Sequence, residues 1–355
     1  MPTSCLQRAL ALVIAIAAGW ALPSQWSEAQ TVVAMVQLPS ADTGNFARMK
    51  ALAQQAKAQG AQLVIFPEGS VFGWLNPAVF TEAAPIPGTY SDQFADIATS
   101  VGIWVAAGLA EKGPKAGPGS LPNAYQAYDS GILVNPQGQI VLHHRKYNVL
   151  QNAFDPAACQ VILNQPQCAY TPGPLSDVAT AATPFGSTAL MVCSDAYTYP
   201  PATALDRLKA LKPDFVIVPW GITAGTQAQC GTSGFNATGF AAEAAAYLKT
   251  AFVVGANAVG PRNYGRFLPS LYCGDSGYAT PTGESVEASQ PTEELVLLTI
   301  PRSFDAKAGP IWDNADAGGK CPTTCNAYAS GWNGQWTTIV PGQMSVCGCV
   351  PGGGH

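Results

Sequence analysis

The chain has 355 residues, of which 48% are hydrophobic and only 11% are charged. Its formal net charge is −5, which leaves no basic surface to hold nucleic acid or anionic lipid, so neither partner is expected. This composition indicates a compact protein.

The amino terminus has the features of an export signal. Arg8 precedes an apolar stretch over residues 9–22, and a polar segment then ends in Ser27-Glu28-Ala29, a small-x-small pattern suited to signal peptidase. The apolar stretch is shorter than the roughly 18 residues that a membrane-spanning helix needs, although an uncleaved anchor is the alternative. We expect residues 1–29 to be a signal peptide, the mature protein to be secreted or periplasmic, and no membrane span to follow.

Three apolar runs with strand character are each followed by a reactive side chain: Leu63–Pro67 by Glu68, Ile140–Arg145 by Lys146, and Ala189–Val192 by Cys193. In α/β proteins, active sites gather beyond the carboxyl ends of the strands. The order of the runs therefore predicts that a carboxylate, an ammonium and a thiol meet at one site.

Other segments complete an α/β pattern. Helical stretches are predicted over residues 45–59, 90–101 and 239–250, and buried strands over 214–220 and 251–257. Strands that alternate with helices indicate layers of helix packed on sheet.

The three reactive groups suit nucleophilic attack on a carbonyl or nitrile carbon. A thiol is mostly protonated at neutral pH, so a base must remove its proton, and Glu68 fits that role. The ammonium of Lys146 and the backbone N–H of Ser194 would stabilise the oxyanion that forms. This chemistry requires no metal and no organic cofactor. Taken singly, Cys193 would be an inert core thiol and the two charges would be solvated loop residues.

The motifs around these three residues favour the catalytic interpretation over the structural one. They are Phe66–Trp74 around Glu68, His144–Lys146, Pro184–Gly186, Val192–Asp195, Pro200-Pro201, and a late turn over Cys273–Gly277 and Pro281–Glu284. In this order they resemble the nitrilase (carbon-nitrogen hydrolase) superfamily, in the form of its vanin and biotinidase branch, over about residues 31–302. The resemblance implies a four-layer α-β-β-α sandwich, with Glu68, Lys146 and Cys193 as the catalytic set.

One feature departs from that pattern. Many members of the superfamily carry a second glutamate, about eight residues after the lysine, that hydrogen-bonds the lysine. Here the eighth residue is Phe154, followed by Asp155. Asp155 would either replace that glutamate or cap the turn before Pro156.

The ten cysteines agree with export. Cys5 lies in the signal peptide and Cys193 is reserved for catalysis, which leaves an even set for disulfides: Cys159, Cys168, Cys230, Cys273, Cys321, Cys325, Cys347 and Cys349. We expect Cys159 to pair with Cys168, Cys230 with Cys273, and the last four among themselves. The alternative for the last four is a zinc site.

A shift in composition near Ser303 marks a second unit over residues 304–355, where Cys, Gly and Trp concentrate. The segments Ala308–Ala317, Trp332–Thr338 and Gln343–Val346 resemble one repeat of the cyanobacterial mannan-binding lectin family. That resemblance implies binding of mannose-containing glycan, and the candidate residues are Trp312, Asn314, Gln335, Trp336 and Thr337. Aromatic faces stack on sugar rings and amides reach hydroxyls, whereas the alternative is that both tryptophans fill a small core.

Two classes of function follow. The first is a secreted thiol hydrolase of small linear amides, targeted to glycans by its carboxyl-terminal module, with a nitrilase proper as a variant of it. The second is a secreted glycan-binding protein whose nitrilase-like domain is only a scaffold. Superfamily members often use a carboxyl-terminal segment to complete a homo-oligomer or to cover the pocket, so these roles are alternatives for the module.

Overall fold

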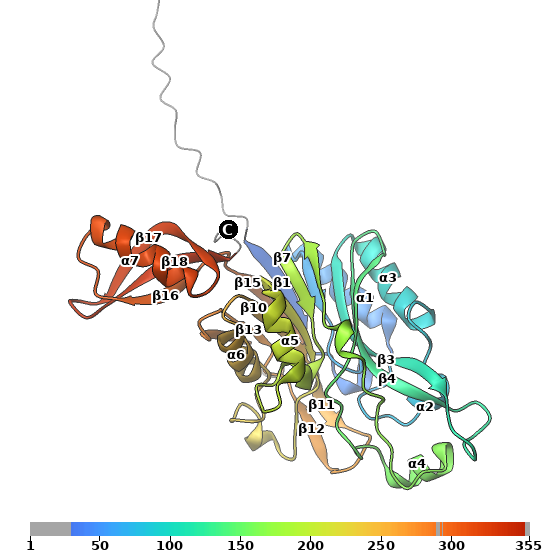
Figure 1. The fold of residues 1–355 in the computed structure, drawn as a ribbon. Helices are drawn as coiled ribbons and strands as arrows, with labels where there is room; N and C mark the ends of the chain where they lie inside the picture. The colour runs from blue at the N-terminus through green and yellow to red at the C-terminus, as the bar shows by residue number, and fades with distance from the viewer. Residues whose placement is uncertain (1–29, 289–291, 293, 352–355) are drawn as a thin grey trace, which may run out of the picture.

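The computed structural model describes residues 30–288, 292 and 294–351 (Figure 1). The predicted signal peptide, together with Cys5 and the terminal His355, lies outside the described residues. No helix in the described part of the chain is long and apolar enough to cross a membrane.

The first of two large sheets has six strands. Their spatial order is β15 (Leu295–Ile300), β1 (Thr31–Val36), β2 (Leu63–Ile65), β3 (Trp104–Lys115), β4 (Tyr125–Val134) and β5 (Ile140–Arg145). Strands β1, β2 and β3 are parallel, and the other neighbours are antiparallel.

The second sheet also has six strands. Their order is β14 (Ser285–Glu287), β13 (Gly277–Ala279), β10 (Phe252–Asn257), β8 (Phe215–Trp220), β7 (Gly186–Leu190) and β6 (Thr180–Thr183). The central strands β10, β8 and β7 are parallel, and β8 and β10 are buried along their whole length, as expected of strands covered on both faces.

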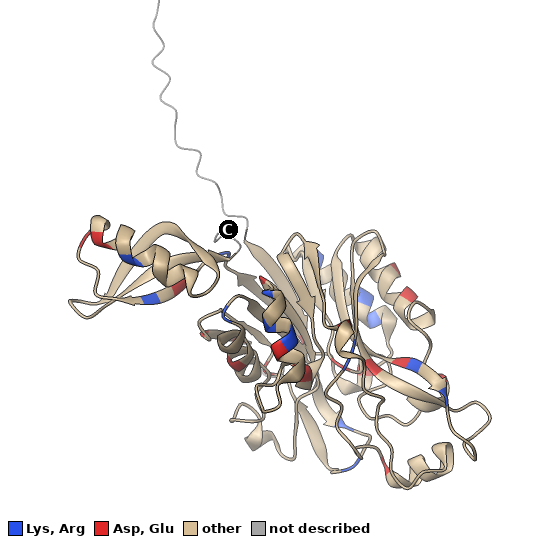
Figure 2. Cartoon of the chain, in the orientation of Figure 1, with Lys and Arg blue, Asp and Glu red and all other residues tan. Residues whose placement is uncertain are grey.

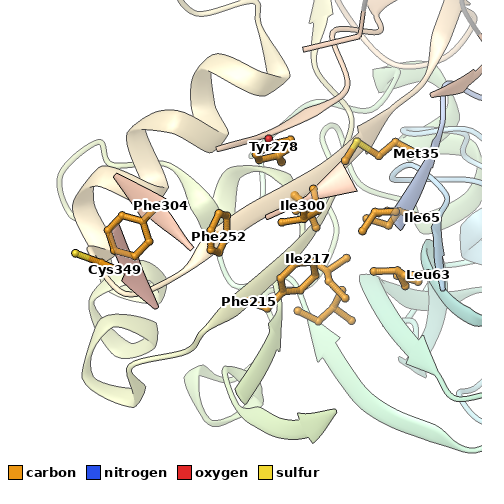
Figure 3. Close-up of a cluster of buried hydrophobic side chains, with 14 of the residues drawn as sticks. Met35, Leu63, Ile65, Phe215, Ile217, Phe252, Tyr278, Ile300, Phe304 and Cys349 are labelled. Atoms are coloured by element: carbon orange, nitrogen blue, oxygen red, sulfur yellow. The ribbon is translucent and has the colours of Figure 1, made fainter. Parts of the chain in front are cut away.

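The two sheets pack face to face through an apolar cluster. Met35, Leu63 and Ile65 of the first sheet meet Phe215 and Ile217 of the second (Figure 3). Burial of this surface contributes on the order of 25 cal/mol for each Å² removed from water, and it holds the layers together.

Helices cover the outer faces. The pair α1 (Phe46–Ala58) and α3 (Thr89–Val101) packs on the first sheet, and the pair α5 (Thr203–Leu211) and α6 (Ala237–Leu248) packs on the second. In α1 the buried residues recur every three or four positions, and the Asn45 side chain caps the first turn by accepting from the Arg48 N–H. The α-β-β-α sandwich that the sequence predicts is therefore confirmed.

Shorter elements complete the fold. They are η1 (Ser40–Asp42), α2 (Val79–Glu82), α4 (Pro156–Leu163), η2 (Leu175–Asp177), η3 (Cys193–Ala196), η4 (Gln227–Gln229), and a small sheet of β11 (Val259–Arg262), β12 (Ser270–Cys273) and β9 (Thr223–Ala224). Figure 1 shows α2, α4, β11 and β12 at the end of the sandwich away from the start of β1.

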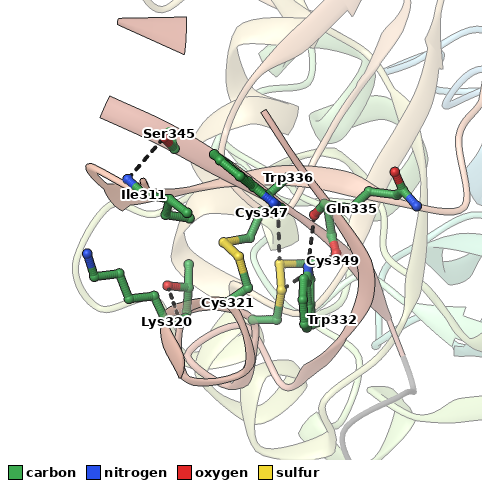
Figure 4. Close-up of a disulfide and its surroundings, with 12 residues drawn as sticks. Ile311, Lys320, Cys321, Trp332, Gln335, Trp336, Ser345, Cys347 and Cys349 are labelled. Atoms are coloured by element: carbon green, nitrogen blue, oxygen red, sulfur yellow. Dashed lines mark hydrogen bonds between the residues drawn. A yellow bond between two sulfur atoms is a disulfide. The ribbon is translucent and has the colours of Figure 1, made fainter. Parts of the chain in front are cut away.

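The carboxyl-terminal segment forms a separate small sheet crossed by one helix. Its strand order is β16 (Phe304–Gly309), β18 (Met344–Pro351) and β17 (Ser330–Val340), all antiparallel, with α7 (Asn314–Asn326) against them. Disulfides Cys321–Cys347 and Cys325–Cys349 tie α7 to β18 (Figure 4). The zinc alternative is wrong, because the four sulfur atoms are bonded in pairs as two disulfides.

The remaining cysteines also agree with the prediction. Cys159 is bonded to Cys168 and Cys230 to Cys273, and Cys193 is the free cysteine of the described residues. The disulfides stabilise short structures with little core of their own, because they restrict the unfolded chain.

The carboxyl-terminal unit joins the sandwich through aromatic packing. The ring of Phe304 lies 6.2 Å from that of Phe252 and 5.4 Å from that of Tyr328. Phe252 is the first residue of β10, so the unit contacts the amino ends of the parallel strands. Figure 1 shows it, in red, beside the end where β1 begins. Acidic and basic side chains are spread over both units without a run of one sign (Figure 2).

Candidate active site

Glu68, Lys146 and Cys193 converge beyond the ends of their strands. The Nζ of Lys146 donates to Oε1 of Glu68 at 2.5 Å, and Lys146 and Cys193 line one pocket. The three residues are 2%, 2% and 4% exposed. A carboxylate, an ammonium and a thiol are thus held together out of water, as the sequence predicts.

The carboxylate of Glu68 fits only because two neighbours are glycines. A Cβ at Gly221 would lie 1.9 Å from Oε2 of Glu68, and a Cβ at Gly108 would lie 2.6 Å from its Cα. Gly108 also holds the turn after β2, since its carbonyl accepts from the N–H of Ser70 at 2.9 Å. Within the described residues, Oε2 of Glu68 has no hydrogen-bond partner, so this oxygen is free to accept a proton.

The nucleophile candidate sits on a strained turn. Cys193 has φ of 43°, in the left-handed region, directly after the extended Val192. A residue other than glycine costs about 1–2 kcal/mol in that region, and such strain is often found at functional sites. The turn begins the 3-10 helix η3 and places the thiol at the pocket beside Ser194.

The electrostatics keep this thiol protonated in the resting site. Burial raises the pKa of Cys193 to about 12, assisted by the negative charge of Glu68, while Lys146 and the backbone N–H of Gly221 act in the other direction. Burial alone would lower the pKa of Lys146, but Glu68, Cys193 and Asp129 together outweigh it, and the pKa ends well above its usual value. Lys146 is therefore a permanent cation, and Cys193 needs a base.

A second acid contacts the lysine, and the sequence reasoning missed it. Asp129, on β4, is buried, and its Oδ2 lies 3.4 Å from Nζ of Lys146. Burial and the charge of Glu68 raise the pKa of Asp129 well above its usual value, which favours the neutral form of its carboxyl. The signal that would have found it is an acidic residue inside the apolar run that becomes β4.

Asp155 does not take that role. It is exposed, and its Oδ1 accepts from the N–H of Ala157 at 2.8 Å, at the amino end of α4. Of the two interpretations offered by the sequence, the helix cap is the correct one. Phe154 before it is buried against the rings of Phe80 and Tyr170.

Asp195 connects the loop that carries Lys146 to the turn that carries Cys193. Its carboxylate accepts from Nε2 of His144 at 2.6 Å and from two backbone N–H groups, of Tyr147 at 3.0 Å and Asn148 at 2.7 Å. Both members of the His144–Asp195 pair are buried. In the sequence, Lys146 lies between His144 and Tyr147, and Cys193 lies two residues before Asp195. These hydrogen bonds of Asp195 therefore fix the position of the ammonium relative to the sulfur.

The pocket above these groups has a volume of about 420 Å³. It is lined by Trp74, Lys146, Asn148, Val149, Leu150, Cys193, Ser194, Tyr197, Gly221, Ile222, Thr223 and Gly234. Lys146 is the one charged member of this lining, and it is already paired with Glu68. The pocket therefore suits an uncharged molecule with some apolar surface.

The glycan candidates lie on the carboxyl-terminal unit. Trp312 is 70% exposed, so the alternative that it fills the core is wrong. Trp336 is half-buried against the core, and its Nε1 donates to Oδ1 of Asn314 at 2.9 Å. Gln335 and Thr337 are exposed on β17, on either side of Trp336.

A four-layer α-β-β-α sandwich with glutamate, lysine and cysteine at one pocket defines a class of thiol-dependent carbon-nitrogen hydrolases. The family model for carbon-nitrogen hydrolases matches residues 32–304, and the chain belongs to this family. Residues 314–349 match the model of the mannan-binding protein family, which agrees with the resemblance of the carboxyl-terminal unit.

Known relatives are distant. A human pantetheine hydrolase, VNN2, is 24% identical over 187 residues, which cover 47% of this chain and 33% of that protein. A formamidase of Bacillus cereus (strain Q1) is 30% identical over 91 residues, which cover 25% of each protein. The chain thus covers a third or less of the length of these relatives.

Solved structures share the fold. An amidase from Nesterenkonia sp. superposes with a TM-score of 0.54 at 19% identity, over 76% of this chain and 90% of that one. A glutamine-dependent NAD+ synthetase from Acinetobacter baumannii gives a TM-score of 0.55 at 18% identity, over 77% of this chain and 46% of its own.

Proposed function

We propose that the protein is a hydrolase of non-peptide amide bonds that works through a thioester on Cys193. The observation that carries this proposal is the buried contact between Glu68 and Lys146 in the pocket that Cys193 also lines. Buried charges are costly unless they are paired, and a paired base and cation beside a thiol is an arrangement suited to nucleophilic catalysis.

In the first step, the free oxygen of Glu68 takes the proton from the Cys193 thiol. The sulfur then attacks the carbonyl carbon of the amide, and the carbonyl oxygen becomes an oxyanion. The ammonium of Lys146 and the N–H of Ser194 stabilise this oxyanion, by about 3–4 kcal/mol for each well-placed donor. Because Lys146 has a raised pKa, it acts as a fixed charge and gives up no proton.

In the second step, the carbon–nitrogen bond breaks and the protonated Glu68 delivers its proton to the departing amine. The acyl group stays on sulfur as a thioester. Glu68 then takes a proton from water, the hydroxide attacks the thioester, and the carboxylic acid leaves as the thiol regains its proton. The net change is amide plus water to acid plus amine.

The lining of the pocket supports a neutral, linear amide as substrate. Val149, Leu150 and Ile222 provide apolar walls, and Asn148 and Thr223 provide polar contacts. The relatives point to the same chemical class: the human relative is a pantetheine hydrolase and the bacterial one a formamidase. A mutant of the Nesterenkonia amidase has been solved with the acetamide moiety of fluoroacetamide added covalently at its active-site cysteine.

Export and glycan targeting form the second part of the proposal. The four disulfides support an oxidising compartment, and with it the signal peptide at residues 1–29. The exposed indole of Trp312, and Trp336 held by Asn314, support glycan binding by residues 304–355. A single module binds weakly, but it would raise the local concentration of the enzyme on a glycan-bearing surface.

The experiment that tests the hydrolase is intact mass spectrometry after mixing with a panel of neutral amides and nitriles. We expect a mass increase equal to one acyl group, located on the Cys193 peptide and absent from Cys193→Ala. Preference for nitriles would identify a nitrilase proper. A protein that forms no adduct and turns over no member of the panel, yet is retained on mannan, would support the scaffold function instead.

A further inference from the structure

A tyrosine hydroxyl points at the nucleophile from within its own turn. Tyr197 follows η3, and its hydroxyl oxygen lies 3.8 Å from Sγ of Cys193, within hydrogen-bonding distance for sulfur. Both side chains line the same pocket. No motif used in the sequence analysis assigns a role to Tyr197.

The ring of Tyr197 is fixed by other aromatic rings. It stacks on Phe240 with a centroid distance of 4.3 Å and lies nearly parallel to Trp220 at 6.5 Å. Phe240 comes from α6 and Trp220 ends β8, so the hydroxyl is held by two elements of the second sheet layer. A preorganised donor loses little freedom when the sulfur becomes charged.

The charges around the sulfur show why another donor matters there. Among the described residues, the groups that act on it are the carboxylate of Glu68, the ammonium of Lys146, the N–H of Gly221 and the hydroxyl of Tyr197. Burial and the charge of Glu68 oppose a thiolate. Burial and the neighbouring Cys193 raise the pKa of Tyr197 well above its usual value, so the hydroxyl keeps its proton and remains a donor.

We propose that the hydroxyl of Tyr197 donates a hydrogen bond to the sulfur of Cys193 and stabilises the thiolate, which makes Tyr197 a further catalytic residue. Its part in hydrolysis rests on the proposed function, whereas its effect on the thiolate does not. The proton released by the thiol goes to Glu68, and Tyr197 only donates.

Tyr197→Phe tests this directly, because the variant keeps the stacked ring and removes the hydroxyl. The probe is the rate of alkylation by iodoacetamide between pH 7 and 9, with the adduct located on the Cys193 peptide. A hydrogen bond to an ionised group corresponds to about one to two pKa units. Without this hydrogen bond the thiolate is more basic and therefore more nucleophilic, which offsets nearly half of the loss in thiolate population. We therefore expect the alkylation rate to fall about three- to tenfold.

Tyr199→Phe is the matched control. Its ring packs on Tyr197 at 5.6 Å, but its side chain is largely exposed, so removal of its hydroxyl should leave the alkylation rate unchanged. Thermal unfolding of both variants should match that of the parent, which separates a lost donor from a damaged fold.

The outcomes are distinguishable. Equal alkylation rates for Tyr197→Phe and the parent would overturn the inference, even if amides are hydrolysed. Slower alkylation of Tyr197→Phe without turnover of any amide would support the donor and count against the proposed function. If both hold, kcat/KM for a neutral amide should fall with the alkylation rate.

Discussion

At the scale of single residues, the site balances two carboxyl groups against one ammonium. The raised pKa of Asp129 favours its neutral carboxyl and the raised pKa of Cys193 keeps the thiol, so both shifts reduce the negative charge buried beside Lys146. An uncompensated buried charge would cost several kcal/mol, so both shifts act in the direction that burial favours.

The first prediction separates charge from hydrogen bonding at Asp129. A protonated carboxyl and an amide have similar shape and both are neutral, so Asp129→Asn should keep kcat within about threefold of the parent. Asp129→Ala removes the group beside Lys146 and should lower kcat about tenfold or more, since it leaves a donor of the ammonium unpaired. Steady-state kinetics on a neutral amide measure both. An equally severe loss in the two variants would mean that Asp129 works as an ionised group.

The second prediction concerns Gly221. In Gly221→Ala the new Cβ would meet Oε2 of Glu68 at 1.9 Å, so the carboxylate must move or the turn after β8 must shift. We expect loss of nearly all amide turnover and a lower melting temperature. Gly117→Ala is the control, because a Cβ there has no heavy atom within 4 Å. Normal turnover by Gly221→Ala would contradict the position of the Glu68 base.

At the scale of elements, the adjacent strands β3, β4 and β5 are joined by side-chain hydrogen bonds close to the candidate site. Glu111 on β3 is buried and accepts from Ser130 on β4 and from His143 and Arg145 on β5. Ser130 follows Asp129 and Arg145 precedes Lys146, so this network holds the strands that position the lysine and its second acid.

The third prediction is the pH dependence of stability that this network creates. Burial alone would raise the pKa of Glu111, but its bonds to His143 and Arg145 dominate and lower it to about 2. The ionised carboxylate therefore stabilises the fold above the unfolded pKa of about 4.5, and this contribution is lost as the pH falls towards 2. Its full size is on the order of 3 kcal/mol.

Urea unfolding between pH 6 and 2.5 measures this effect. Glu111→Gln should be less stable than the parent near neutral pH, and the difference should shrink as the solution becomes acidic. Asp96→Asn removes an exposed pair with Lys50 and should change little at any pH. A constant difference between Glu111→Gln and the parent across the range would contradict the assignment.

At the scale of the whole molecule, the two units place their candidate sites at different ends. The carboxyl-terminal unit contacts Phe252 at the start of β10, whereas Glu68, Cys193 and Gly221 follow the carboxyl ends of β2, β7 and β8. No described residue of the unit lines the pocket that holds Cys193, so the alternative that the unit covers the pocket of its own chain is wrong.

The fourth prediction follows from that separation. Ending the chain after Ser303 should leave kcat/KM for a small neutral amide within about twofold of the parent value. The melting temperature should fall, because Phe252 loses its packing against Phe304 and becomes exposed. Retention on a mannan column should disappear. Trp336→Ala in the full chain should weaken retention by about 1–3 kcal/mol if the indole is an anchor. Loss of turnover on truncation, with no glycan retention by the full chain, would make the unit a structural extension of the hydrolase.

The sequence by itself determined the local features. Apolar runs followed by Glu68, Lys146 and Cys193 marked strands and their ends, because the pattern of apolar residues along a short segment is enough to predict a buried strand. With Cys5 and Cys193 set aside, cysteine counting left an even set of eight and predicted Cys159 with Cys168 and Cys230 with Cys273, but the pairing of the last four stayed open because an even count does not give connectivity. The same reasoning left two options for Asp155, because a capping residue and a loop acid look alike in a linear sequence.

Only the tertiary structure decided the contacts between distant strands. Asp129 meets Lys146, Gly221 makes room for Glu68, and Tyr197 reaches Cys193 from a ring held by α6 and β8. None of these follows from spacing, because the distances depend on how two sheets stack and how each turn bends. The physical reason is that burial and close approach, which set the protonation of the site, are properties of packed layers and not of any one segment.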